Sequence, residues 1–202
     1  MYYFLHFGGE DEKKEMSFSG TIYNKKKVVV DTIFDDGNIL KESDIHAPFT
    51  IILDEKESSI KKKSQTDKIS TYVIESGFVF LISPTARAIF EKLNIDNLQY
   101  FDVVVKSSTL EVKDYKIVNI TDKIDCVDFD ASDLELYRNG NIDSITTLVL
   151  NENKIPKDKQ IFLLGRRATG VIIVHESLKK AIEESKLTGF YFVRLDEADQ
   201  LY

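Results

Sequence analysis

Short runs of β-branched and aromatic residues recur along all 202 residues of this chain, and they constrain its fold more than any other feature. Such runs, bounded by turn residues such as glycine and asparagine, favour half-buried strands and hairpins over helices. They predict strands at 2–7, 21–23, 27–34, 49–53, 72–83, 98–105, 115–120, 145–150, 161–164 and 170–174. We therefore expect an α+β fold built mainly on antiparallel sheet.

Two segments have the apolar spacing of a helix, and a constant offset of 92 residues relates them, because it aligns Leu81 with Ile173. The same offset aligns Ser83 with His175 at the predicted start of each helix. Serine is a good N-cap, and Pro84 suits the first helical position because its missing N–H has no partner there in any case. A capping role is the interpretation we favour for His175.

The two segments also end alike, since Asn97 aligns with Gly189. Asparagine and glycine most readily take the left-handed conformation that ends a helix. The sequence thus predicts two short helices in a strand-helix-strand unit that is repeated, at 78–105 and at 170–196. We expect one domain over 1–202, with a β-rich part at 1–70 that includes a charged, mobile loop near 54–68.

Composition narrows the class of protein. The apolar fraction of 43% suffices for a packed core, and no stretch approaches the roughly 20 apolar residues of a membrane-spanning helix. The start of the chain predicts a strand rather than a signal peptide, and a single cysteine, Cys126, suits the reducing cytoplasm. A net charge of −7 argues against general binding to nucleic acid.

Motifs for metal or nucleophilic chemistry are missing from the sequence. His6, His46 and His175 are isolated from one another and from Cys126, so no metal or other cofactor is expected. The segment 165–170 holds Arg166 and Arg167 between two glycines, but it leads into a strand, so a hairpin turn is more consistent with it than a phosphate loop.

An acidic run is the most distinctive local feature. Between 121 and 137 the acids are Asp122, Asp125, Asp128, Asp130, Asp133 and Glu135. Apolar residues alternate with them and no glycine supplies the sharp turn of a calcium loop. Their spacing indicates a half-exposed segment with the acids turned outward. A partner-binding surface and a pair of catalytic carboxylates both stay open as interpretations.

The segment Val171–Phe192 resembles the C-terminal signature of a family of bacterial immunity proteins of polymorphic toxin systems, immunity family eleven. The family pattern is a short strand, then Ser-Glu-x-Leu-Lys-x-Ala-Leu, then Leu-x-Gly-Phe/Val-x-Phe. The segments 82–103 and 115–132 are similar to its central elements, so the resemblance covers about 72–196. The chain departs from the pattern at His175, where a serine is usual.

This resemblance implies a cytoplasmic, non-catalytic protein that binds and neutralises a cognate secreted toxin. The partner-binding candidates are the six acids of the run together with Asp196, Glu197 and Asp199 near the end of the chain. It implies a protein partner, with no nucleic acid, membrane or cofactor, and leaves a homodimer open. The alternatives are a small enzyme or nucleotide-binding domain that uses the Asp122–Asp133 carboxylates with Arg166 or Arg167, and an assembly protein with a large apolar self-interface.

Overall fold

A computed structural model describes residues 1–6, 16–30, 34, 36–53, 66–73, 77–106, 112–167 and 170–198. Most of the predicted charged loop, residues 54–65, lies outside the described part, and so does Asp199. The elements, in chain order, are β1 (Tyr2–His6), β2 (Met16–Tyr23), α1 (Glu42–Ile45), β3 (Phe49–Leu53), β4 (Lys68–Val73), β5 (Gly77–Ile82), α2 (Pro84–Lys92), β6 (Leu98–Lys106), β7 (Lys116–Ile120), β8 (Lys123–Ile124), β9 (Asp133–Leu136), β10 (Ile142–Thr147), the 3₁₀ turn η1 (Glu152–Lys154), β11 (Ile161–Leu164), β12 (Ile172–His175), α3 (Glu176–Glu184) and β13 (Tyr191–Arg194).

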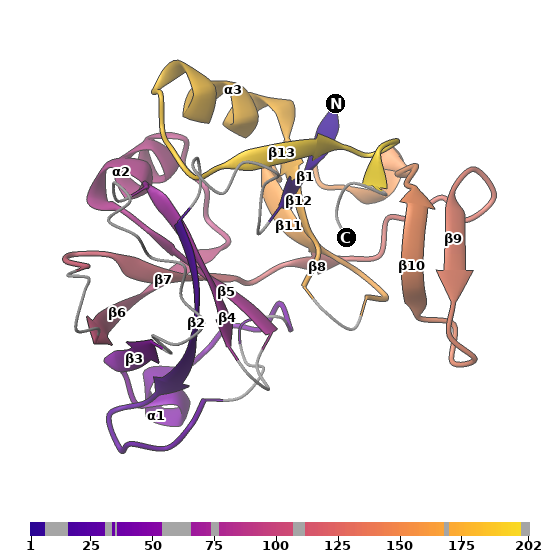
Figure 1. Ribbon diagram of the computed structural model, residues 1–202. Coiled ribbons are helices and arrows are strands. Elements are labelled where there is room, and N and C mark those ends of the chain that lie inside the picture. Colours follow the sequence, from indigo (N-terminus) through magenta and orange to yellow (C-terminus); the bar gives the residue numbers. More distant parts are fainter. Residues whose placement is uncertain are drawn as a thin grey trace.

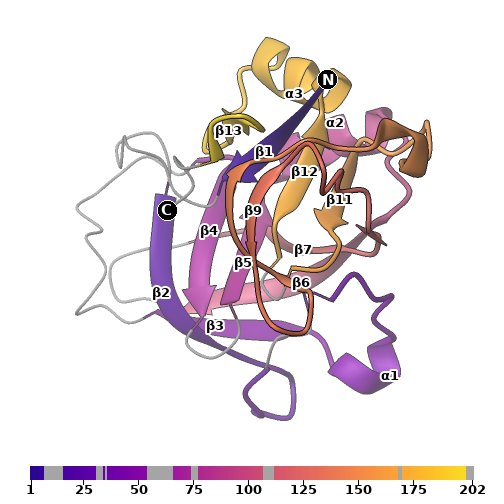
Figure 2. The same cartoon turned by 90° about the vertical axis from the view of Figure 1, so that its right-hand side faces the viewer.

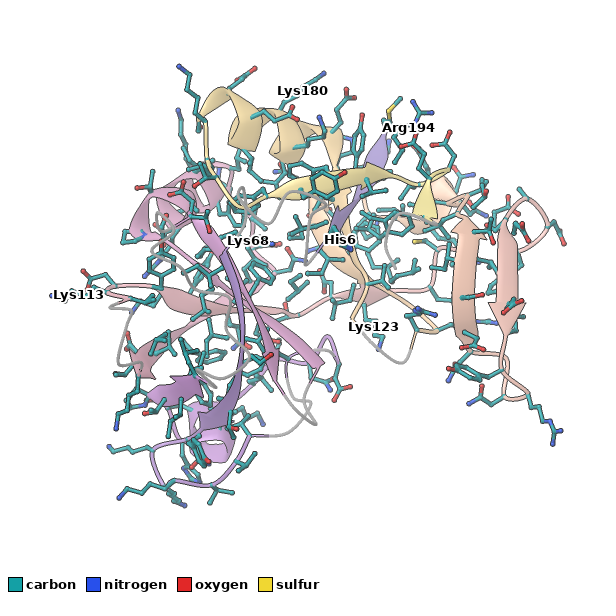
Figure 3. All side chains as sticks on the ribbon, in the orientation of Figure 1. His6, Lys68, Lys113, Lys123, Lys180 and Arg194 are labelled. Carbon is teal, nitrogen blue, oxygen red and sulfur yellow. The ribbon has the colours of Figure 1, made fainter. Side chains whose placement is uncertain are left out.

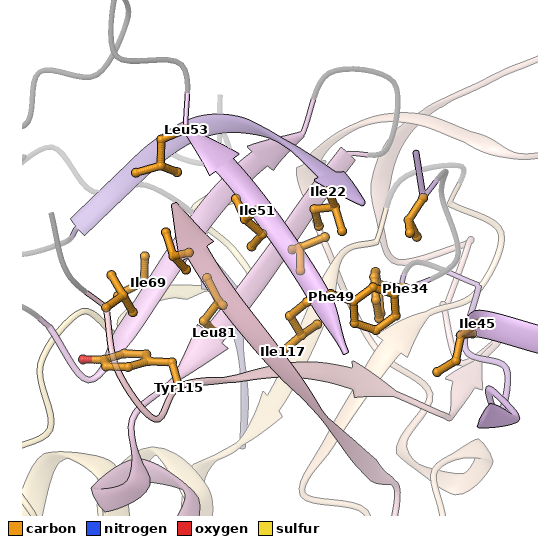
Figure 4. Packing of buried hydrophobic residues seen from close by; sticks show 14 residues of the cluster. Ile22, Phe34, Ile45, Phe49, Ile51, Leu53, Ile69, Leu81, Tyr115 and Ile117 are labelled. Atoms are coloured by element: carbon orange, nitrogen blue, oxygen red, sulfur yellow. The ribbon is translucent and has the colours of Figure 1, made fainter. Parts of the chain in front are cut away.

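Strands β2, β3, β6, β7, β5 and β4 close, in that order, into a barrel (Figure 1). The pairs β2–β4 and β3–β6 are parallel, and the other neighbours are antiparallel. Alternate residues of each strand point inward, so that Phe49 and Ile51 are fully buried while Ile52 is exposed. Figure 4 shows the inward side chains, with Phe49, Leu81 and Ile117 packed at the centre of the barrel.

A second sheet holds five strands in the order β13-β1-β12-β11-β8. The two-stranded ribbon β9–β10 lies to one side of this sheet in Figure 1, and in Figure 2 β9 is seen in front of it. One face of the five-stranded sheet packs on α2, α3 and the barrel through Leu163, Ile172 and Val174. The other face packs on the ribbon and the segment before it through Phe4 and Phe162. Because both faces are covered, all four residues of β11 are buried.

The α+β prediction, with mainly antiparallel sheet and two short helices, is confirmed. In the first unit β5 and β6 run parallel with antiparallel β7 between them, and in the second β12 and β13 run parallel with antiparallel β1 between them. Ile117 of β7 faces Leu81 and Phe101. Phe4 of β1 faces Ile173 and Val193, which are the same two positions moved by 92 residues.

The C-terminal ends of α2 and α3 are also related by the offset of 92 residues. The backbone N–H groups of Leu93 and Ser185 bond the carbonyls of Ile89 and Ala181, and the two residues that follow, Asn94 and Lys186, have φ values of 52° and 55°. The expectation that Asn97 would be left-handed is wrong: the left-handed residue is Asn94, and Asn97 is buried with its amide donating to the Ile161 carbonyl at 2.7 Å. Gly189 does have a positive φ, of 82°.

Several strand predictions need correction. Of the expected strand 27–34, residues 31–33 lie outside the described part, and the described residues 27–30 form a turn around Lys27, with φ of 62°, and a bridge at Val29. The apolar run 72–83 belongs to two strands, β4 and β5, which pair as a hairpin. The strand expected at 145–150 begins earlier, at Ile142, because its partner β9 extends toward the turn at Asn139-Gly140. The sequence patterns do not predict α1, β8 or β9.

Candidate functional site

The predicted acids Asp122 and Asp125 lie next to β8, at the edge of the five-stranded sheet. Lys159 binds Asp122 and Asp96 together, each at 2.9 Å. Partial burial alone would lower the pKa of Lys159, but its hydrogen bonds to these two carboxylates outweigh burial and raise it, and the same bond lowers the pKa of Asp96. The Arg166 guanidinium binds Asp125 at 2.8 Å and lies 5.0 Å from the Phe129 ring centroid. Both sheet-edge acids therefore have cations of the same chain beside them.

Asp128 has a structural role in the turn that leads to β9. Its carboxylate accepts the backbone N–H groups of Asp130 and Ala131 at 3.2 and 3.3 Å, as an aspartate does in an Asx turn. Its backbone carbonyl accepts the N–H of Ser132. Because these bonds shape the turn, substitution of Asp128 would change the entry into the ribbon as well as its charge.

The acids of the ribbon and of the turn before it differ from the sheet-edge acids because no cation is paired with them among the described residues. Asp130 and Asp133 are exposed, and no cation among the described residues forms an ion pair with either. Glu135 accepts a hydrogen bond from the Ser144 hydroxyl across the ribbon at 3.0 Å. A hydrogen bond to Asp143 raises the pKa of Tyr137 at the ribbon's end. The exposed cation Arg138 follows Tyr137, but the acids outnumber it, so net negative charge gathers on β9–β10, which projects at one end of the molecule (Figure 1).

Arg194 lies beside Asp196 and Glu197, the two described acids near the end of the chain. Arg194 binds Asp196 through two nitrogens, at 2.8 and 2.7 Å, and its hydrogen bond lowers the pKa of Asp196. Glu197 lies 3.8 Å from the same guanidinium. Figure 3 places Arg194 on the surface, toward the end of β13 that is nearer the ribbon. These acids therefore contribute less net charge than their number suggests.

The residues of the enzyme alternative meet in one place within the described part of the chain, the Asp125–Arg166 pair, whose side chains are 44% and 50% exposed. Arg167 instead donates to the Ile142 carbonyl at 3.1 Å and so supports the base of the ribbon. Asp122 instead pairs with Lys159, and Asp133 lies on β9 of the ribbon. The acids are spread over an edge, a turn and a ribbon, an arrangement that suits a contact surface better than a catalytic pair.

The histidines and the cysteine have local surroundings of their own. His175 Nδ1 accepts the Ser177 N–H at 3.2 Å, which confirms its predicted capping role in α3. His46 contacts Lys26 at 2.8 Å, and His6 stacks edge-on against Tyr191. Burial raises the pKa of the Cys126 thiol to about 11.

Among the residues that the structure describes, no three histidine, cysteine or acidic side chains are placed to hold a metal ion. No helix of this described part is long and apolar enough to cross a membrane.

Two exposed apolar residues at the end of β9 are not among the site residues predicted from the sequence. Leu136 and Tyr137 are 49% and 50% exposed, beside the acids of β9. Large apolar side chains of this kind, set among charged ones, are common at protein interfaces. The available signal is their position close before Asn139-Gly140, a dipeptide typical of hairpin turns, because residues that flank such a turn are seldom covered.

The barrel, the five-stranded sheet and the acidic ribbon define an α+β protein whose distinctive surface is suited to contact with another macromolecule. Over residues 31–197 the sequence matches the model of the Immunity protein family (Imm11), and the chain belongs to that family. The match begins in the β-rich N-terminal part, well before the region 72–196 in which the sequence resemblance was found. A comparison with curated proteins gives no match.

Proposed function

We propose that this protein binds a cognate toxin of a polymorphic toxin system in the cytoplasm and neutralises it without catalysis. The observation that carries the proposal is the family match over 31–197. An immunity protein of this kind requires a folded scaffold and a complementary surface, and both can be provided without any catalytic group.

The partner-binding surface in this proposal is drawn from the predicted acids, and the ribbon acids contribute most. Asp130, Asp133 and Glu135 are exposed and have no ion-pair partner within the described residues, so their field extends into solvent. Asp122, Asp125, Asp196 and Glu197 share their charge with Lys159, Arg166 and Arg194 and serve as secondary contacts. Asp128 shapes the turn, and Asp199 stays a candidate outside the described part.

A net charge of −7 favours a basic partner. Opposite charge steers association and can raise rate constants from about 10⁵–10⁶ to about 10⁸–10⁹ M⁻¹s⁻¹ at low salt. We therefore expect the toxin to present a basic surface to the ribbon, with Leu136 and Tyr137 as apolar contacts inside the charged rim.

The test is to produce this chain together with the toxin encoded beside its gene, and to measure survival, complex stoichiometry and association rate. The double variant Asp133→Lys/Glu135→Lys is expected to slow association by about tenfold or more and to reduce its salt dependence. The matched control, Asp196→Lys/Glu197→Lys, reverses two acids that already have a cation beside them and should have a smaller effect.

Stoichiometry separates the binder from the enzyme alternative. A binder protects only when it is at least equimolar with the toxin, whereas an enzyme protects at a small fraction of that amount. Protection by substoichiometric protein that is lost in Asp125→Asn would favour the enzyme and contradict our proposal. A purified pair that neither associates nor protects would contradict it as well.

A further inference from the structure

The outer face of the barrel carries exposed apolar side chains on β3, on β6 and in the segment that follows β2. The strand registers place Val29 opposite Tyr23, Tyr23 opposite Thr50, and Thr50 opposite Val104. Residues that face each other across a ladder project on the same side of the sheet, so these four side chains form one continuous row. In the next row Ile52 lies opposite Thr21 on β2. We call these residues the barrel face.

The barrel face is exposed to an unusual degree for its chemistry. Val29, Ile52 and Val104 are 44%, 47% and 52% exposed. Three of the ten large apolar side chains that the described residues expose thus lie together, where scattered single ones would need no explanation. A contiguous apolar patch on a soluble surface marks an interaction site.

Lysines border the barrel face. Lys25, Lys26 and Lys27 form the exposed turn that joins Tyr23 to Val28, and exposed Lys106 lies opposite Ile52. On the neighbouring side, Asp102 is neutralised by its ion pair with Lys116. Within the part of the chain that the structure describes, the barrel face is therefore apolar with a positive rim, although the overall charge of the chain is −7. Its partner should be apolar with a negative rim.

The β9–β10 ribbon of this same protein has that chemistry. Exposed Leu136 and Tyr137 follow the exposed acids Asp130, Asp133 and Glu135, which outnumber the exposed cation Arg138 on their other side. The ribbon and the barrel face lie at opposite ends of the molecule, so one chain cannot bring them together (Figure 1). A second copy can.

We propose that the barrel face binds the β9–β10 ribbon of a second copy of this chain. The closed barrel has no free strand edge, so the contact is made by side chains and not by added strand pairing. A symmetric pairing of two barrel faces would bring lysines against lysines, whereas the ribbon brings carboxylates to them. The resulting contact is head-to-tail, and it builds rings or short chains of copies. This contact uses the ribbon that we also assign to the toxin, so a second copy and the toxin would compete for it, but self-association is measured without the toxin.

The test uses the full chain in sedimentation velocity from low micromolar to millimolar concentration. The expected result is a sedimentation coefficient that rises with protein concentration and falls when salt is added. Lys25→Glu/Lys27→Glu on the barrel face and Asp133→Lys/Glu135→Lys on the ribbon should each weaken self-association by about tenfold or more. The control Lys154→Glu/Lys157→Glu changes the charge on an exposed loop outside both surfaces and should leave it unchanged.

Mixing the two reversed variants gives the sharpest result. The ribbon variant keeps a native barrel face, and the barrel-face variant keeps a native ribbon, so the mixture should form a one-to-one complex that cannot extend. A native chain that stays monomeric at every concentration would overturn the proposal. So would a ribbon variant that still dimerises, because it would show two barrel faces paired with each other, and so would a mixture without a complex.

Discussion

Gly189 joins α3 to β13 where the C-terminal sheet meets the barrel. Its φ is 82°, and a Cβ built on it would lie 2.3 Å from the backbone oxygen of Lys68 and 2.9 Å from Thr66. Lys68 is fully buried at this contact, and its ammonium group donates to the Gly189 carbonyl at 3.1 Å. Figure 3 shows Lys68 in the interior, between the barrel and the second sheet. Glycine is required here both by the backbone conformation and by the close approach of another strand.

A comparison of two glycines separates these requirements. Gly140 has nearly the same φ, 80°, but a Cβ there would meet no atom within 4 Å. Gly140→Ala should therefore lower the free energy of unfolding by about 1 kcal/mol, the cost of a left-handed alanine. Gly189→Ala adds a backbone collision and should cost more than about 3 kcal/mol. Urea unfolding of both variants measures the difference, and equal losses would show that the backbone at Gly189 adjusts freely.

At the scale of the element, α3 begins with an unusual cap. Burial lowers the pKa of His175, which favours the neutral ring whose Nδ1 can accept the Ser177 N–H. A histidine with a lowered pKa in the folded state stabilises fully above its unfolded pKa, near 6.5, and this stability is lost as the pH falls below that value. The cap of the equivalent helix α2, Ser83, accepts the Ala86 N–H at 3.1 Å and does not titrate.

The variant His175→Ser should keep the cap and remove the titration. We expect its free energy of unfolding to stay within about 1 kcal/mol of the native value at neutral pH, and to fall less between about pH 7 and about pH 5. His175→Ala should lose the cap, at a cost of about 1 kcal/mol, as well as the pH dependence. If His175→Ser keeps the native pH profile, another group must be responsible for it.

The sequence predicts the elements of this protein better than their assembly. The two helices can be predicted from the sequence because Ser83, Pro84 and the spaced apolar residues act locally. The barrel cannot be predicted in the same way, because its closure depends on parallel pairs between strands distant in sequence, such as Phe49 with Val103. The acids of the run were expected to face outward, but the cations that neutralise Asp122 and Asp125 come from 159 and 166, and only the fold brings them near.

At the scale of the whole molecule, the two repeated units differ in where their middle strand comes from. In the first unit β7 follows β6 along the chain and inserts between β5 and β6. In the second unit the same place is taken by β1, which precedes everything else. Arg194 at the end of β13 faces Tyr3 near the start of β1 in an antiparallel register. A short connection could therefore join β13 to β1 as a hairpin, as β6 is joined to β7.

This geometry predicts that a permuted chain folds. A variant that starts at residue 7 and carries residues 1–6 after residue 202, through a short glycine-serine linker, should regain the order β13-β1-β12. We expect one cooperative unfolding transition, because the face of the five-stranded sheet that holds Leu5 shares its core with α2, α3 and the barrel. The control omits residues 1–6 altogether, leaving Phe4 and Leu5 absent from two core clusters, and should be strongly destabilised. A permuted chain no more stable than this control would show that β1 does not take its place in the sheet through the new connection. Equal stability of the permuted and native chains would show that the two units are interchangeable in topology and differ only in the order of their strands.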